Sequence, residues 1–137
     1  SYEAAAVDET AWEADFQWTN GATSIWGEYI RSEIEPDGGS AITADGYYLY
    51  LHQFLPYRGR NDKLELVLGR QDFDPNTDVT DVYDLTAYIL GLNYHLQGSR
   101  YTEGRCQDMV RLNYIWNKEA ENEVDNNKVV LQYQTWF

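Results

Sequence analysis

The chain has a single cysteine, Cys106, among its 137 residues, and only three prolines. One thiol excludes an internal disulfide framework and a metal site built from several cysteines. Few prolines and 15% aromatic residues also argue against a disordered acidic tail. No apolar run approaches the roughly 18 residues that a membrane helix requires. Basic residues number ten against 23 acidic ones, and the net charge of −13 argues against general nucleic-acid binding.

Hydrophobic residues recur with a period of two through most of the chain. The clearest segment is 10–18, in which apolar side chains alternate with acidic and amide ones. Such alternation predicts a strand with one apolar and one polar face. Asn20-Gly21 follows directly and predicts a tight hairpin turn. We expect seven strands, at 10–18, 24–35, 46–55, 63–73, 82–96, 108–117 and 127–137, with a bulge or register change in the second.

The strands are about ten residues long, and no segment between them has a helical stripe. Strands of about 9–11 residues cross a bilayer when tilted, whereas soluble strands average about five or six. The sequence therefore predicts an all-β fold, an antiparallel up-and-down transmembrane β-barrel. Residues 1–137 form a single β-barrel domain or the C-terminal part of one. Because single-chain bacterial barrels have even strand numbers, we expect either a longer native chain or other chains to supply further strands.

Aromatic residues gather near the ends of the expected strands, as they do in the girdles of membrane barrels. The alternative is that these rings fill a core or stack against a sugar. The expected girdle residues are Trp12, Trp18, Tyr47, Trp116, Tyr133 and Phe137.

The last expected strand carries Leu131, Tyr133 and Phe137 at alternating positions, interrupted by Thr135. This pattern resembles the C-terminal signal of bacterial outer-membrane proteins, and it implies recognition by the outer-membrane insertion machinery. The alternative is an ordinary amphipathic strand at the end of the sequence.

The connections between strands alternate in charge. Counted back from Phe137 as a periplasmic end, the outer loops are 36–43, 74–81 and 119–126, and they are rich in acidic residues. The opposite connections hold basic residues, namely Arg58, Arg60, Arg100 and Arg105. We therefore expect the acidic loops to face divalent cations and lipopolysaccharide.

Several segments, in this order and spacing, resemble the phosphate-selective porin O and P family of bacterial outer membranes. They are GEYIRSE (27–33), GYY to FL (46–55), LELVLGR (64–70), AYILGLNYHL (87–96), VRLNY (110–114) and residues 129–137. The resemblance implies a homotrimeric porin in the outer membrane, a passive diffusion channel for small hydrophilic solutes or ions, including anions such as phosphate.

The resemblance also implies a barrel of about sixteen strands, of which this chain supplies about seven. The constriction loop would then belong to an N-terminal half that lies outside this sequence. Selectivity in the family rests on basic residues in the lumen, whereas this chain is strongly acidic.

Polar positions of the expected strands are the candidates for lining the pore. They are Lys63, Asn93, Arg111, Lys128 and Gln132, with Arg31 and Arg70 from less regular strands. The residues expected to face lipid are Leu64, Leu66, Leu90, Leu92, Val110, Leu112, Val129 and Leu131.

Other chemistry is weakly represented. His52 and His95 lack metal-ligand spacing and are expected in the lumen or core. Glu13 and Asp15 are spaced like a catalytic pair, but charges lining the lumen explain them better. The sequence has no nucleophile motif and no phosphate-binding loop, so we expect neither an enzyme nor a cofactor.

One acidic loop has the alternating oxygen ligands of a calcium site. Its candidate ligands are Asp72, Asp74, Asn76 and Asp78. The loop lacks the Gly at the sixth position and the Glu at the twelfth, so a solvated acidic loop is the expected state.

Two further functions remain open. One is a soluble all-β barrel that binds a ligand or carbohydrate by stacking it on tryptophan and tyrosine. The other is a small membrane barrel with an enzymatic or adhesive role. Solubility without detergent distinguishes the soluble barrel from the porin.

Overall fold

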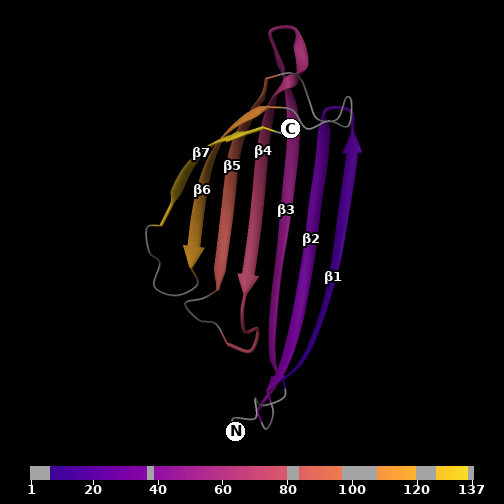
Figure 1. Ribbon diagram of the computed structural model, residues 1–137, viewed down its shortest axis with the longest axis vertical. Coiled ribbons are helices and arrows are strands. Elements are labelled where there is room, and N and C mark those ends of the chain that lie inside the picture. The colour runs from indigo at the N-terminus through magenta and orange to yellow at the C-terminus, as the bar shows by residue number, and fades with distance from the viewer. Residues whose placement is uncertain (1–6, 37–38, 80–83, 97–107, 120–125, 136–137) are drawn as a thin grey trace.

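The computed structural model describes residues 7–36, 39–79, 84–96, 108–119 and 126–135. These residues form one sheet of seven strands whose spatial order follows the sequence, from β1 to β7 (Figure 1). The strands are β1 (Val7–Asn20), β2 (Thr23–Pro36), β3 (Ile42–Tyr57), β4 (Arg60–Asp74), β5 (Leu85–His95), β6 (Met109–Glu119) and β7 (Lys128–Gln134). Each neighbouring pair is antiparallel, which confirms the all-β up-and-down arrangement. The described part of the chain contains no helix that could cross a membrane.

The first four strands are longer than expected, with 14 residues in β1 and 16 in β3. The expected beginning of the fifth strand at residue 82 lies outside the described residues, as does the expected end of the seventh at residue 137. The described parts of these strands begin at Leu85 and end at Gln134.

Two hairpins close through two-residue turns. The first turn is Gly21-Ala22, one residue later than predicted, because Asn20 pairs with Thr23. Gly21 has a φ of 58°, and a turn with positive φ at its first central residue favours glycine there. The second turn is Arg58-Gly59. Both of its residues have positive φ, as a type I′ hairpin turn requires.

The bulge predicted in segment 24–35 is absent, and β2 pairs in unbroken register with both neighbours. The irregularity lies instead between Leu55 and Tyr57 of β3. Pro56 occupies that position, and proline has no N–H to donate to a ladder, so the strand interrupts its pairing there.

The sheet is open, with β1 and β7 as its two edges. Residues 10–18 do not pair with the described part of β7, so the expectation that the chain does not close a barrel alone is confirmed for the described strands. Among the described residues, each edge leaves a row of backbone N–H and C=O groups without a ladder partner.

The register divides the side chains between two faces. The polar face is the side of the sheet that carries Glu65, and the apolar face is the side that carries Leu66. Asn93 and Arg111 pair with one another and lie on the polar face, where Gln132 and Lys128 also lie. The predicted lipid-facing residues all lie on the apolar face, namely Leu64, Leu66, Leu90, Leu92, Val110, Leu112, Val129 and Leu131.

Burial is concentrated on the polar face. In the described ranges, all of the buried non-glycine residues lie there: Ser24, Phe54, Glu65, Val67, Ala87, Asn93, His95, Met109 and Asn117. On the apolar face, Leu90 is 53% exposed and Leu112 is 48% exposed. The sheet is therefore curved toward its polar side chains, which pack against one another.

Arg31 and Arg70 do not share the face of Arg111, so that part of the prediction is wrong. Arg70 pairs with Leu49 and Tyr88 on the apolar face, because counting by two along β4 from Leu64 leads to it. Arg31 pairs with Trp12 on the same apolar face.

Candidate functional site

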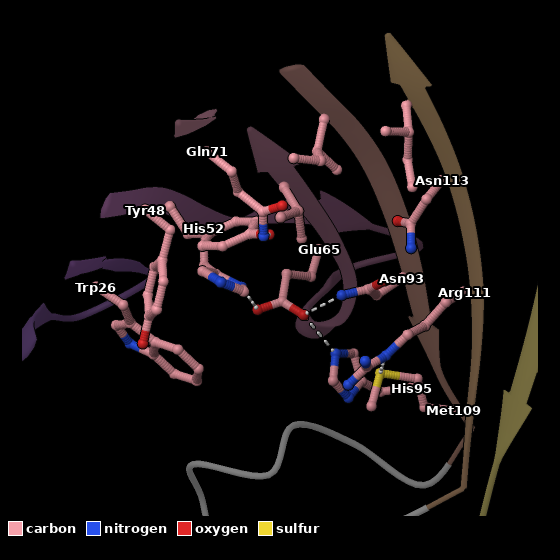
Figure 2. Close-up of a pocket in the computed structure, with 14 residues that line it drawn as sticks. Trp26, Tyr48, His52, Glu65, Gln71, Asn93, His95, Met109, Arg111 and Asn113 are labelled. Atoms are coloured by element: carbon pink, nitrogen blue, oxygen red, sulfur yellow. Dashed lines mark hydrogen bonds and ion pairs between the residues drawn. The ribbon is translucent and has the colours of Figure 1, made fainter. Parts of the chain in front are cut away.

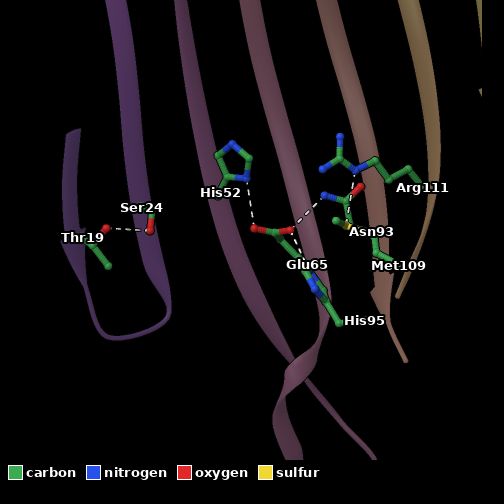
Figure 3. A network of polar contacts seen from close by, with 8 residues as sticks. All are labelled: Thr19, Ser24, His52, Glu65, Asn93, His95, Met109 and Arg111. Atoms are coloured by element: carbon green, nitrogen blue, oxygen red, sulfur yellow. Dashed lines mark hydrogen bonds and ion pairs between the residues drawn. The ribbon is translucent and has the colours of Figure 1, made fainter. Parts of the chain in front are cut away.

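The polar face is organised around one buried carboxylate, Glu65 of β4, which is 2% exposed. Asn93 Nδ2 donates a hydrogen bond to Glu65 Oε2 at 2.9 Å. His95 Nε2 lies 3.0 Å from the same oxygen, and His52 Nδ1 lies 3.0 Å from Glu65 Oε1. Figure 3 shows these groups converging on the carboxylate from β3 and β5.

A buried carboxylate is costly unless donors replace its water, and three donors do so here. Ionised Glu65 can only accept, so the ring nitrogens that face it carry protons. That assigns Nδ1–H to His52 and Nε2–H to His95. The arrangement therefore fixes the orientation of both imidazoles and of the Asn93 amide.

Aromatic contacts hold the two histidines on their other sides. The Trp26 and His52 rings lie 4.7 Å apart between centroids, and the Phe54 and His95 rings lie 5.3 Å apart. The side chain of His95 is only 2% exposed and that of His52 is 12% exposed. The network is thus enclosed on the side of β5 and partly accessible on the side of β3.

Beside this network lies a cavity of about 360 Å³ that receives side chains from β2 to β6. Figure 2 shows Glu65 in the middle, with Trp26 and Tyr48 on one side and Arg111 and Met109 on the other. A cavity lined by five successive strands on one face requires the sheet to curve around it. It therefore combines an aromatic wall from β2 and β3 with a polar wall from β5 and β6.

Two of the predicted pore-lining residues, Asn93 and Arg111, line this cavity. Arg111 Nε donates to Met109 Sδ at 3.3 Å, and no carboxylate of the described residues forms an ion pair with its guanidinium. Lys63 Nζ donates to the backbone oxygen of Leu96. Gln132 and Lys128 lie on the polar face, on the edge strand beyond the cavity.

Arg70 belongs to a separate cluster on the apolar face. Its Nε donates to Asp72 Oδ2 at 2.7 Å, and its guanidinium lies 5.6 Å and 5.8 Å from the ring centroids of Tyr47 and Tyr88. Thr86 Oγ1 also donates to Asp72, at 2.7 Å. The guanidinium of Arg70 thus lies near two tyrosine rings, and Asp72 pairs its charge.

The candidate calcium ligands are engaged in local contacts. Asp72 binds Arg70, while Asp74 Oδ1 and Asn76 Oδ1 accept the backbone N–H groups of Asn76 and Asp78. Such side-chain contacts shape a turn. Within the described ranges, no group of three histidine, cysteine or acidic residues could hold a metal ion.

The five described girdle candidates all lie on the apolar face and are exposed: Trp12, Trp18, Tyr47, Trp116 and Tyr133. Tyr47 lies five residues inside β3. Trp18, Trp116 and Tyr133 lie within three residues of a strand end, whereas Trp12 lies five residues inside β1. Trp116 stacks near Tyr88 at 5.8 Å between centroids.

The expected assembly signal is described in part. Leu131 and Tyr133 lie on the exposed apolar face of β7, at 74% and 60% exposure. Phe137 lies outside the described residues.

Glu65 is not among the site residues predicted from the sequence. Alternation places His52 on the polar side of segment 46–55. It also places Asn93 and His95 together on the polar side of segment 82–96. Their convergence required the register between β3, β4 and β5. One signal was available in the sequence. Glu65 is an acidic residue among leucines, and its strand lies between two strands that each carry a histidine on the polar side.

Comparison with known family models, curated proteins and solved structures finds no match to this chain.

Proposed function

We propose that this chain forms part of a bacterial outer-membrane porin, a passive diffusion channel for small hydrophilic solutes or ions. The observation that carries the proposal is the direction of curvature. The sheet bends around a cavity on its polar face and leaves its leucine-rich face exposed, with Leu131 at 74% and Leu112 at 48% exposure.

Closing a sheet that is curved in this direction encloses polar side chains and turns apolar ones outward. A porin has this arrangement, with a polar lumen and an apolar band against lipid. A soluble ligand-binding barrel needs the reverse, because its apolar side chains form the interior. The buried polar residues, Glu65 and Asn93 among them, therefore support the membrane form over the soluble one.

The open edges support a larger barrel. An unpaired backbone group in lipid costs several kcal/mol, so β1 and β7 need strand partners. In our proposal, further strands of a barrel of about sixteen strands pair with both edges, and three copies associate as a homotrimer. The exposed face contacts outer-membrane lipid, and the acidic loops adjoin lipopolysaccharide. The segment that carries Leu131, Tyr133 and Phe137 is recognised by the insertion machinery.

Adjacent cysteines on β6 test this proposal in isolated outer membranes. In a Cys106→Ser background, Arg111→Cys and Leu112→Cys place a thiol on opposite faces of one strand. We expect a membrane-impermeant maleimide to label position 111 and not position 112. A fluorophore at position 112 should instead be quenched by brominated lipid chains.

Equal labelling of positions 111 and 112 by the aqueous reagent would contradict a lipid-facing β6. Single-channel recording in planar bilayers tests the second part of the proposal. A protein embedded in lipid that gives no conductance steps is a membrane barrel without a pore, and that result contradicts the channel function.

A further inference from the structure

The aromatic wall of the cavity depends on a glycine. A Cβ at Gly69 would lie 2.4 Å from Tyr50 Cε1, so the Tyr50 ring occupies the space that any other residue would fill. Gln71 Nε2 donates to the Tyr50 hydroxyl at 2.6 Å and holds the ring there. Tyr48 lies alongside, with 5.5 Å between the ring centroids, and Trp26 completes the wall. The cavity is therefore flanked by rings that are fixed in place.

The opposite wall depends on a second glycine. A Cβ at Gly91 would lie 2.5 Å from Asn113 Oδ1, so the Asn113 amide folds over β5. Next to it, Asn93 turns its nitrogen to Glu65 and its oxygen to the other side, as Figure 3 shows. Asn93 is only 5% exposed, and its buried Oδ1 has no hydrogen-bond partner in the described part of the chain.

The hydrogen-bonding groups left at this wall are of mixed kind. Asn93 Oδ1 is an acceptor, the Nη atoms of Arg111 are donors, and the Asn113 amide is both. Glu65 is already satisfied by three donors. A fully deprotonated anion such as sulfate offers only acceptors and would leave Asn93 Oδ1 unpaired, whereas a hydroxyl group donates and accepts.

We propose that this cavity binds an uncharged, hydroxylated six-membered ring of the pyranose sugar class. The apolar face of the sugar ring packs on the wall of Trp26, Tyr48 and Tyr50, and its hydroxyls bond to Asn93, Arg111 and Asn113. The volume of about 360 Å³ lies at the lower end of the range for small-molecule sites, about 300–1,000 Å³. Recognition of a sugar as the transported solute rests on the proposed channel, but the binding site itself does not.

Isothermal titration calorimetry of the full chain, in an amine-oxide detergent free of sugar headgroups, tests the site with D-glucose and maltose as probes. We expect saturable binding that Tyr50→Ala weakens at least tenfold and Tyr50→Phe weakens less than threefold. Gly91→Ala removes no polar group but displaces the Asn113 amide, so it should weaken binding several-fold. Arg111→Met tests the polar wall if Tyr50→Ala does not fold.

Tyr47→Ala is the matched control, because Tyr47 lies on the same strand with its side chain on the apolar face. It should leave the affinity unchanged. Equal affinity in Tyr50→Ala and the unsubstituted chain would overturn the proposal. So would the absence of saturable binding of both sugars, or binding of inorganic phosphate that competes with them and depends on Arg111.

The two proposals fail separately. A protein that conducts potassium chloride but binds neither sugar overturns the sugar site and leaves the channel. A protein that binds glucose at Tyr50 while position 112 reacts with the aqueous maleimide overturns the membrane location and leaves the site.

Discussion

Asn93 and Leu92 are neighbours on β5, yet the amide is 5% exposed and the leucine is 41% exposed. The same contrast separates the two faces of the whole sheet. On the polar face, directional hydrogen bonds converge on Glu65 from three side chains. On the apolar face, leucines cover one another little, and the ion pair of Arg70 and Asp72 lies at the surface. This chain therefore places its strongest internal interactions, the hydrogen bonds to Glu65, on the enclosed side of the sheet, where a water-soluble domain places its apolar core.

Removing the Glu65 carboxylate should have the largest effect. Glu65→Ala leaves His52, His95 and Asn93 without their shared acceptor, and we expect the free energy of unfolding to fall by about 3–5 kcal/mol. Urea titration in detergent measures it. Glu13→Ala is the control, because Glu13 is exposed and makes no ion pair with any described residue, and it should shift stability by less than about 0.5 kcal/mol. Similar small shifts for both variants would show that the enclosed Glu65 network stabilises the fold no more than an exposed carboxylate of the same polar face does.

Arginine on the apolar face should have the next largest effect. Leu112→Arg should disfavour insertion into lipid by about 2–4 kcal/mol if residue 112 lies near the midplane. Val130→Arg makes an equivalent change on the polar face, where the arginine stays in water, and should cost about 1 kcal/mol or less. Urea unfolding from lipid vesicles compares them. Equal costs for the two variants would show that lipid does not distinguish the faces.

Two glycines sharpen the comparison at a smaller scale. A Cβ at Gly69 meets the Tyr50 ring at 2.4 Å, and a Cβ at Gly27 on the apolar face meets the Phe16 ring at 2.3 Å. Tyr50 is tied to Gln71, so Gly69→Ala should cost about 1–3 kcal/mol. Phe16 is 52% exposed and can rotate away, so Gly27→Ala should cost less. Unfolding midpoints of both variants, measured side by side, decide whether the enclosed ring is the more rigid one.

The smallest effect is expected at the Arg60–Asp62 pair. Its two contacts are 2.6 Å and 2.9 Å long, but water and salt screen an exposed pair of this kind. Asp62→Asn should therefore give no measurable change in the unfolding midpoint. A clear loss of stability would mean that the hairpin end of β4 contributes as much as the enclosed network.

The strands and their faces were predictable because alternation is a local property of the sequence. Leu112 and Arg111, for example, lie on opposite faces as their positions in the pattern require. Arg70 was misassigned although alternation from Leu64 leads to the apolar face. Its strand was taken to be less regular than the others, whereas β4 alternates without interruption there and Tyr47, Tyr88 and Asp72 accommodate Arg70 on the apolar face.

The candidate site was not predictable, because it depends on register between strands. Glu65 meets His52 and His95 diagonally across two ladders, while its direct partners are Phe54 and Asn93. The pairing of β3 with β4 follows from the Arg58-Gly59 turn and the irregularity at Pro56. Composition and alternation alone do not determine this register, since shifting one strand by two residues leaves every side chain on the same face.

Every described strand pairs only with its neighbours in the sequence. The loops closed by Gly21-Ala22 and Arg58-Gly59 are as short as hairpins permit, so forming them sacrifices little chain entropy. Topologies dominated by such local pairings fold faster than those that join distant segments. This sheet can therefore assemble by adding one hairpin to the next. A chain with more strands can extend either edge by whole hairpins without altering a pairing that has already formed.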